Sequence, residues 1–159
     1  LDATGGGESA NSYVDLAEAN AYFADRLDSD AWTEAGATSP PRQERALITA
    51  AYRLDQEEYR GEKASSTQAL AWPRVGIPGV DSTAIPVEIK RAQMELALAL
   101  LTEETSLADT GLEAFENVKI GPIDITPRQR SAGALPAHVR RFLRGVLAGS
   151  AVQFRIVRG

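Results

Sequence analysis

The chain contains 159 residues, the usual length of one domain, and 43% of them are hydrophobic, which is enough for a buried core. Length and composition therefore exclude a disordered or fibrous protein. The absence of cysteine excludes disulfides, thiolate nucleophiles and cysteine-based zinc sites, and it fits a reducing cytoplasm. The longest apolar run, Leu96 to Leu101, is well short of the roughly 18 residues that cross a bilayer, so we expect no membrane association.

Charge is distributed unevenly between the two ends of the chain. Residues 1–124 contain 10 Lys and Arg against 22 Asp and Glu, a net charge of −12. Residues 125–159 contain seven Arg and no acid, a net charge of +7. The basic end either attracts the acidic body within one molecule or reaches an acidic neighbour or DNA, and the sequence leaves both interpretations open.

The first part of the chain predicts a flexible terminus and two helices. Residues 1–11 are rich in glycine, lack the regions of a signal peptide and are expected to be flexible. A capping-box pattern that starts at Asp15 begins a helix over residues 16–27. Residues 28–39 are interpreted as a polar link, and an apolar stripe predicts a second helix over residues 41–59.

The middle of the chain predicts a long loop, a buried helix and a hairpin. Turn-forming residues interrupt residues 61–85, which are expected to form a long ordered loop. Residues 86–103 are apolar on most sides and should form the central helix of the domain. Residues 115–126 alternate around Gly121-Pro122, which predicts a short β-hairpin with its turn or bulge at that step.

The last part predicts a helix with a basic face and a terminal strand. Residues 136–148 should form a helix that points three arginines outward: Arg140, Arg141 and Arg144. Residues 150–159 alternate apolar and polar side chains, and a strand of this kind needs an edge to pair with. No other long strand offers one, so we expect pairing with a partner. The predicted class is mainly α: a four-helix bundle over residues 12–149 with a short β-hairpin and an extended C-terminal strand or arm.

The sequence offers no catalytic or metal-binding pattern. His138 is the only histidine and has no neighbouring carboxylate to orient it, so a Ser-His-Asp triad is not expected. Adjacent acids such as Glu57-Glu58 and Glu103-Glu104 point in different directions on a helix and predict no metal site. We therefore expect neither enzymatic activity nor a cofactor.

The main alternative function is single-stranded DNA binding. The seven-arginine end would contact phosphates while Phe142 and Phe154 stack on bases. The other aromatic residues argue against it, because Trp32 lies in an acidic stretch that repels phosphate. Trp72-Pro73-Arg74 is interpreted as an anchor that pins the loop over residues 61–85 to the helical core.

Several motifs occur in an order that resembles one protein family. They are Asn11 to Phe23 followed by Trp32, Ala46 to Ala51, Gln68 to Arg74, Ile85-Pro86, and Val118 to Ile123. Together they resemble the head-tail connector or adaptor proteins of tailed bacteriophages, which are often labelled DnaT-like single-stranded-DNA-binding proteins. The resemblance covers residues 11–142, and its most specific parts are Leu70 to Arg74 and Ser12-Tyr13-Val14.

The resemblance implies a mostly helical, connector-type subunit in the neck of the virion. About twelve copies would form a ring beneath the portal protein and present their far side to a stopper or tail-completion protein. DNA would pass through the central channel without specific binding. The family supplies no catalytic residues.

Within this hypothesis, the portal contact is assigned to the terminal strand by strand addition: Val152, Gln153, Phe154, Arg155, Ile156, Val157 and Arg158. Contacts with other copies or with the tail-side partner are assigned to the basic helix, the anchor and the hairpin: Arg140, Arg141, Arg144, Trp72, Arg74, Ile120, Gly121, Pro122 and Ile123. Acidic side chains are expected to line the channel, because walls that do not hold phosphate let DNA pass.

Overall fold

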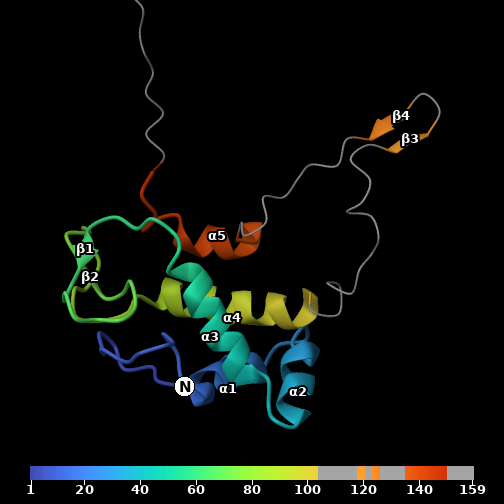
Figure 1. Cartoon of the computed structure of the whole chain (residues 1–159), viewed down its shortest axis with the longest axis horizontal. Coiled ribbons are helices and arrows are strands. Elements are labelled where there is room, and N and C mark those ends of the chain that lie inside the picture. Colours follow the sequence, from blue (N-terminus) through green and yellow to red (C-terminus); the bar gives the residue numbers. More distant parts are fainter. Residues whose placement is uncertain (104–117, 121–122, 126–134, 150–159) are drawn as a thin grey trace, which may run out of the picture.

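The computed structural model describes residues 1–103, 118–120, 123–125 and 135–149 (Figure 1). The elements of these residues are α1 (Leu16–Ala24), α2 (Asp30–Ala37), α3 (Gln43–Leu54), β1 (Glu62–Lys63), β2 (Arg74–Val75), α4 (Val87–Glu103), β3 (Val118–Ile120), β4 (Ile123–Ile125) and α5 (Ala137–Leu143). β1 pairs antiparallel with β2, and β3 with β4. None of the described helices is long and apolar enough to cross a membrane. The predicted mainly α class is confirmed.

One helix was not predicted. α2 occupies most of the segment, residues 28–39, that we interpreted as a polar link, so the described residues form five helices rather than four. Its inward side chains, Trp32 and Ala35, are buried, and the Trp32 indole N–H donates to Asn20 Oδ1 at 2.9 Å. The sequence of α2, DAWTEAGA, has too few large apolar residues for periodicity to indicate a helix.

Three helices are shorter than predicted. α1 ends at Ala24 and α3 at Leu54, before the expected ends at residues 27 and 59. α5 ends at Leu143 rather than residue 148, because residues 146–148 leave the helix and pair with residues 58–60. The helical periodicity of residues 136–148 gives no sign of this pairing, because the two segments are far apart in sequence.

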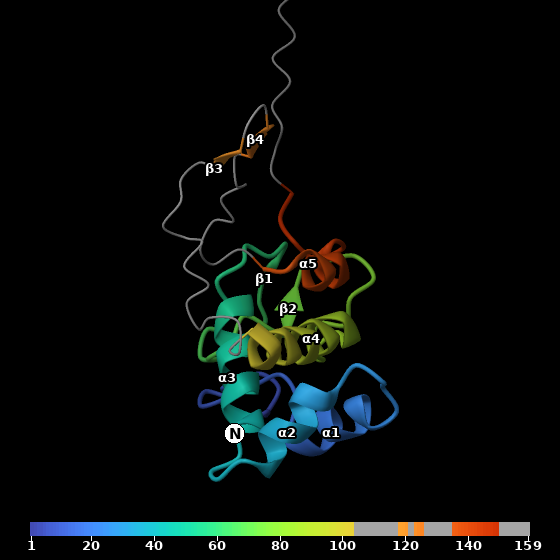
Figure 2. The ribbon, with the colours of Figure 1, turned by 90° about the vertical axis from the view of Figure 1, so that its right-hand side faces the viewer.

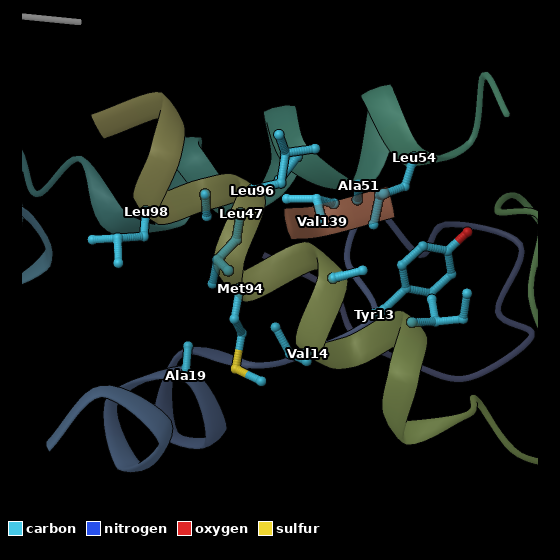
Figure 3. Packing of buried hydrophobic residues seen from close by; sticks show 14 of the residues in the cluster. Tyr13, Val14, Ala19, Leu47, Ala51, Leu54, Met94, Leu96, Leu98 and Val139 are labelled. Atoms are coloured by element: carbon cyan, nitrogen blue, oxygen red, sulfur yellow. The ribbon is translucent and has the colours of Figure 1, made fainter. Parts of the chain in front are cut away.

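α4 is the central helix, as its apolar sequence predicts. α2, α3 and α5 all pack against it (Figures 1 and 2). Figure 3 shows Leu47 and Ala51 of α3, Leu96 of α4 and Val139 of α5 meeting in the core. Removing these apolar side chains from water is the main favourable contribution to folding.

A buried glutamine connects α4 to two other parts of the chain. The side chain of Gln93 is 0% exposed. Its Oε1 accepts from the Tyr13 backbone N–H at 2.8 Å, and its Nε2 donates to Ser12 Oγ at 2.7 Å and to the Leu47 carbonyl at 2.9 Å. Because a buried polar group without partners is costly, these bonds fix the N-terminal segment and α3 against α4.

Residues 1–11 differ from the flexible terminus that we expected. The Asn11 N–H donates to the Asp2 carbonyl at 2.9 Å, and the Ala69 N–H donates to the Gly7 carbonyl at 3.0 Å. Gly6 has a left-handed φ of 72° and lies against the Pro73 ring. Gly6 therefore allows a turn conformation that other residues rarely adopt, and it does not make the segment flexible.

The loop over residues 61–85 is ordered, as predicted, and it contains both strands of the short β1–β2 ladder. The buried amide of Gln68 holds its first part together: Oε1 accepts from the Ser65 N–H at 2.9 Å, and Nε2 donates to the carbonyls of Leu70 and Pro73 at 2.9 and 3.1 Å. Gly61 begins the loop with a φ of 68°, and a Cβ there would lie 2.1 Å from the Val75 carbonyl oxygen. The close approach of β1 and β2 therefore requires glycine at this position.

Gly61→Ala and Gly79→Ala separate this steric contact from the cost of a left-handed backbone. Gly79 has a φ of 78° but no atom within 4 Å of a Cβ placed there. We expect Gly79→Ala to lower the free energy of unfolding by about 1–2 kcal/mol through backbone strain alone. Gly61→Ala should cost at least about 2 kcal/mol more, because a backbone carbonyl must move. Urea denaturation measures both values, and equal losses would contradict the role of Gly61.

Candidate partner interface

α5 places its basic residues on one exposed face because its apolar residues face the core. Val139 and Leu143 are buried, while Arg140, Arg141 and Arg144 are exposed. Arg140 and Arg141 lie in the last turn of the helix, where the helix dipole favours positive charge. We call these three arginines the α5 basic face.

The α5 basic face has no acidic partner among the described residues. The ion pairs recorded for this part of the chain involve Arg26, Lys90 and the N-terminal amine, and none involves α5. Residues 1–103, by contrast, carry 17 acidic and nine basic side chains. The separation of charge expected from sequence is therefore a feature of the described surface, which combines a basic helix with an acidic body.

Backbone pairing fixes the position of residues 146–148, which follow α5. The Arg60 N–H donates to the Val146 carbonyl at 2.9 Å, and the Ala148 N–H donates to the Glu58 carbonyl at 2.8 Å. Leu147 thereby forms an antiparallel bridge with Tyr59. The predicted portal-binding residues follow this pairing but lie outside the described residues: Val152, Gln153, Phe154, Arg155, Ile156, Val157 and Arg158.

Trp72 and Arg74, which the sequence assigned to partner contacts, hold the long loop instead. Trp72 is 1% exposed, and its ring meets that of Tyr59 edge-on at 5.4 Å. The Arg74 guanidinium donates to the carbonyls of Arg60 at 2.8 Å and Gly61 at 2.6 Å. The structure therefore confirms the anchor interpretation of this motif and places Trp72 in the core rather than on a contact surface.

The predicted hairpin has its two strands where the sequence placed them. In β3 and β4, Ile120 is paired with Ile123, and Val118 with Ile125. Gly121 and Pro122, the predicted turn, lie outside the described residues.

Sequence reasoning missed a buried contact between Tyr13 and Asp55. Asp55 follows the last residue of α3, accepts from the Tyr13 hydroxyl through Oδ1, and accepts from the Ala71 N–H through Oδ2 at 2.9 Å. Burial raises the pKa of the Asp55 carboxyl above its usual range, and the two donors oppose that change. Burial, with the neighbouring Asp55, also raises the pKa of the Tyr13 hydroxyl. Tyr13 therefore stays protonated as a donor, and the pair joins three segments rather than forming a reactive site.

One hollow of the described surface lies beside the histidine. His138 is exposed and borders one hollow together with Arg26 and Glu95. The Arg26 guanidinium already binds Glu95 and Asp28. Among the residues that the structure describes, no group of three or more His, Asp or Glu side chains could hold a metal ion.

The aromatic side chains of the described body are mostly unavailable for base stacking. Trp32, Trp72 and Phe23 are buried, and Tyr59 is buried with its hydroxyl donating to the Leu54 carbonyl at 2.9 Å. Tyr52 on α3 is the large aromatic residue that the described part exposes, at 66%. A groove that binds single strands usually combines several aromatic platforms with a basic track, which this body does not present.

Comparison with known protein families places the chain in one of them. A family model described as "Putative DnaT-like ssDNA binding protein" matches residues 2–159. No curated protein and no solved structure matches the chain. The family match covers both the helical body and the basic end.

Replacing Tyr13 by Phe tests the buried pair through its pH dependence. The lost hydrogen bond to a charged carboxylate should cost about 1.5–3 kcal/mol of unfolding free energy at pH 7. The loss should be smaller at pH 3, where Asp55 is protonated. The sign follows from linkage: without its donor, Asp55 has a still higher native pKa, so the mutant binds its proton more tightly and loses stability as pH rises. Tyr52→Phe, which alters an exposed hydroxyl on α3, should change stability by less than about 0.5 kcal/mol at either pH. An equal cost of Tyr13→Phe at both pH values would contradict the pairing with an ionised Asp55.

Proposed function

Because the chain belongs to the family of DnaT-like ssDNA binding proteins, we propose that it acts by binding rather than by catalysis, through its basic C-terminal region. Two kinds of partner fit a basic region: an acidic protein surface and a nucleic acid. The geometry of the described residues favours the protein. The specific proposal is a structural head-tail connector subunit of a tailed bacteriophage, located in the neck of the virion.

The observation that carries this proposal is the α5 basic face, which has no acidic partner among the described residues, on an acidic body. A heterologous ring needs two different, complementary surfaces on every subunit. A basic helix and an acidic body supply such a pair, and the resemblance to connector proteins points in the same direction. In the proposed assembly the subunits ring the DNA channel, and residues 150–159 dock on the portal by strand addition, with Val152, Phe154 and Ile156 as apolar anchors.

The pairing at Leu147 supports this role for the last residues. Its two backbone hydrogen bonds hold residues 146–148 against residues 58–60. A segment that leaves a rigid body from a fixed point loses less freedom on binding than one that leaves from a flexible linker. Arg155 and Arg158 would then meet acidic side chains of the portal.

Single-stranded DNA binding remains a second candidate because the family description names it. Seven arginines without an acid in residues 125–159 are suited to phosphate contacts. The body itself argues against it, since its tryptophans are buried and its net charge repels phosphate. In this candidate function the stacking groups would be Phe142 and Phe154.

Removing residues 150–159 tests the proposed portal contact. In the connector, the truncated chain should lose at least about tenfold in affinity for the portal ring of the same phage, measured by sedimentation velocity or mass photometry. Arg141→Glu should weaken association between copies of the chain several-fold through charge repulsion, whereas Arg91→Glu, the same change at an exposed position of α4, should not. Unchanged portal affinity after truncation would refute the proposed arm.

A titration with fluorescent oligo-dT tests the second candidate. We expect no binding at physiological salt. Binding that depends on residues 150–159 and weakens steeply between 50 and 200 mM salt would establish the DNA function instead, because phosphate contacts release counterions.

A further inference from the structure

A hollow of about 370 Å³ lies beside α3. Its apolar walls include Ile48, Leu70 and the ring of Tyr52, a residue that is 66% exposed. Its polar walls include Asp55 and Gln56, which follow the last residue of α3. Sites that take small ligands have volumes of about 300–1,000 Å³, so this hollow is large enough to hold a side chain. We call it the α3 hollow.

Asp55 gives the α3 hollow a carboxylate that no described cation contacts. Its Oδ1 accepts from the Tyr13 hydroxyl, and its Oδ2 accepts from the Ala71 N–H at 2.9 Å. Both donors are uncharged, and no ion pair is recorded for Asp55 within the described part of the chain. A carboxylate can accept about four hydrogen bonds, so Asp55 retains capacity for a charged donor.

Two basic side chains act on Asp55 from a distance. Lys63 and Arg74 lower the pKa of its carboxyl, although burial raises that pKa overall. The Lys63 ammonium donates to the Ala69 carbonyl at 3.2 Å, and the Arg74 guanidinium donates to the Gly61 carbonyl at 2.6 Å. These contacts hold both cations against backbone oxygens, so the carboxylate in the α3 hollow is left for another cation.

The walls of the α3 hollow fit the side chain of an arginine. A guanidinium can donate two parallel hydrogen bonds to a carboxylate such as Asp55 and can stack on an aromatic ring such as Tyr52. The methylene groups of an arginine can pack on apolar walls such as Ile48 and Leu70. A lysine presents a compact charge without a planar face, so it matches a carboxylate beside an aromatic ring less well.

The chain leaves the described body close to the α3 hollow. The Ala148 N–H donates to the Glu58 carbonyl at 2.8 Å, and in Figure 1 the chain after α5 passes the connection between α3 and β1. Gln56 precedes Glu58 by two residues, which is at most about 7 Å of chain. Ile48, at the other end of the hollow, lies about 12 Å from Gln56 by the rise of a helix. The hollow therefore lies within about 25 Å of Ala148.

Residues 150–159 have the length and the composition to reach and fill the α3 hollow. Ten extended residues span about 33 Å, which exceeds the distance from Ala148 to the hollow. The segment contains Arg155 and Arg158 and no acidic side chain. Its apolar side chains can cover the apolar walls around the bound arginine.

We infer that residues 150–159 fold back over their own domain and place an arginine, Arg155 or Arg158, in the α3 hollow against Asp55. The same chain is favoured over a second copy because a short tether gives an effective concentration in the millimolar range. Residues 126–134 also contain arginines, but they join the body at the beginning of α5, the end of that helix away from residues 146–148.

This inference goes beyond the proposed function, because it concerns the chain before any partner is bound. A partner that takes residues 150–159 must displace them from the α3 hollow. Its apparent affinity is then reduced in proportion to the fraction of molecules in which the segment is free. The hollow thus reserves the segment for a surface that binds it more tightly.

A spin label at the end of the segment tests where it lies in the full chain. The natural sequence has no cysteine, so Gly159→Cys takes a single nitroxide without loss of a side chain. We expect the label to broaden the NMR signals of backbone amides around the α3 hollow, such as those of Asn11, Ala69 and Gln56. Amides of α2, which lies on the other side of α3 from β1 and β2 in Figure 1, should keep their intensity. Unbroadened signals around the hollow would overturn the inference.

Mixing two samples distinguishes the chain's own segment from that of a second copy. Isotope-labelled wild type is combined with isotope-free Gly159→Cys that carries the nitroxide. We expect the wild-type signals to keep their intensity, since the contact lies within one molecule. Broadening around the α3 hollow in this mixture would assign the contact to a second copy and refute the inference.

Removing both arginines of the segment tests the contact with Asp55. Arg155→Gln, Arg158→Gln should abolish the broadening around the α3 hollow. It should also raise the pKa of Asp55, measured from its carboxyl NMR signal during a pH titration, because a nearby cation favours the ionised form. The control Arg140→Gln, Arg144→Gln removes the same charge from α5. It should change neither quantity, because salt screens charges that lie farther away.

Two outcomes of the titration contradict the assignment. An unchanged pKa of Asp55 in Arg155→Gln, Arg158→Gln would mean that neither guanidinium lies against the carboxylate. A raised pKa in Arg128→Gln, Arg130→Gln would give the α3 hollow to residues 126–134 instead. None of these experiments contains portal or DNA. The inference can therefore fail while the connector function holds, and the connector function can fail while the segment still fills the hollow.

Discussion

The arrangement of the helices depends on the hydrogen bonds of one buried side-chain amide, that of Gln93. Gln93 lies in the centre of α4 with no exposed surface, and its hydrogen bonds reach two other parts of the chain, the Ser12-Tyr13 segment and Leu47 of α3. An amide left without partners in such a place would cost more than a single hydrogen bond contributes, so the Ser12-Tyr13 segment and α3 must dock in one register. Apolar packing supplies most of the driving force for folding, but this amide selects the arrangement.

The motifs that gave the strongest resemblance are those that build this arrangement. Ser12 and Tyr13 bind Gln93, Tyr13 also reaches Asp55, and Gln68 with Trp72 and Arg74 closes the long loop onto the end of α3. Their side chains are occupied by contacts inside the domain. A family recognised by such residues shares a scaffold, and the function must be sought on surfaces that the scaffold leaves free.

Those surfaces differ from one another in charge. The α5 basic face stands on a body whose residues 1–103 carry more acidic than basic side chains. Separate surfaces of opposite character favour assembly with several partners over the binding of one ligand in one pocket. This distribution is the physical reason for preferring a ring subunit to a single-strand binder, whose aromatic and basic groups would be expected along one track.

Local periodicity in the sequence was enough to predict the helical class, the central position of α4 and the outward arginines of α5. Local hydrogen bonding predicted the capping of α1 by Asp15, and the size of its side chain predicted the anchoring role of Trp72. It did not reveal α2, whose few apolar residues become a helix only when Trp32 finds its place in the core. It also did not reveal the docking of residues 1–11, the pairing of residues 146–148 with residues 58–60, or the Tyr13–Asp55 contact. These depend on segments far apart in sequence meeting in space. Which groups from distant parts of the sequence become neighbours is decided by the tertiary structure, because no local sequence pattern specifies how far apart they lie in space.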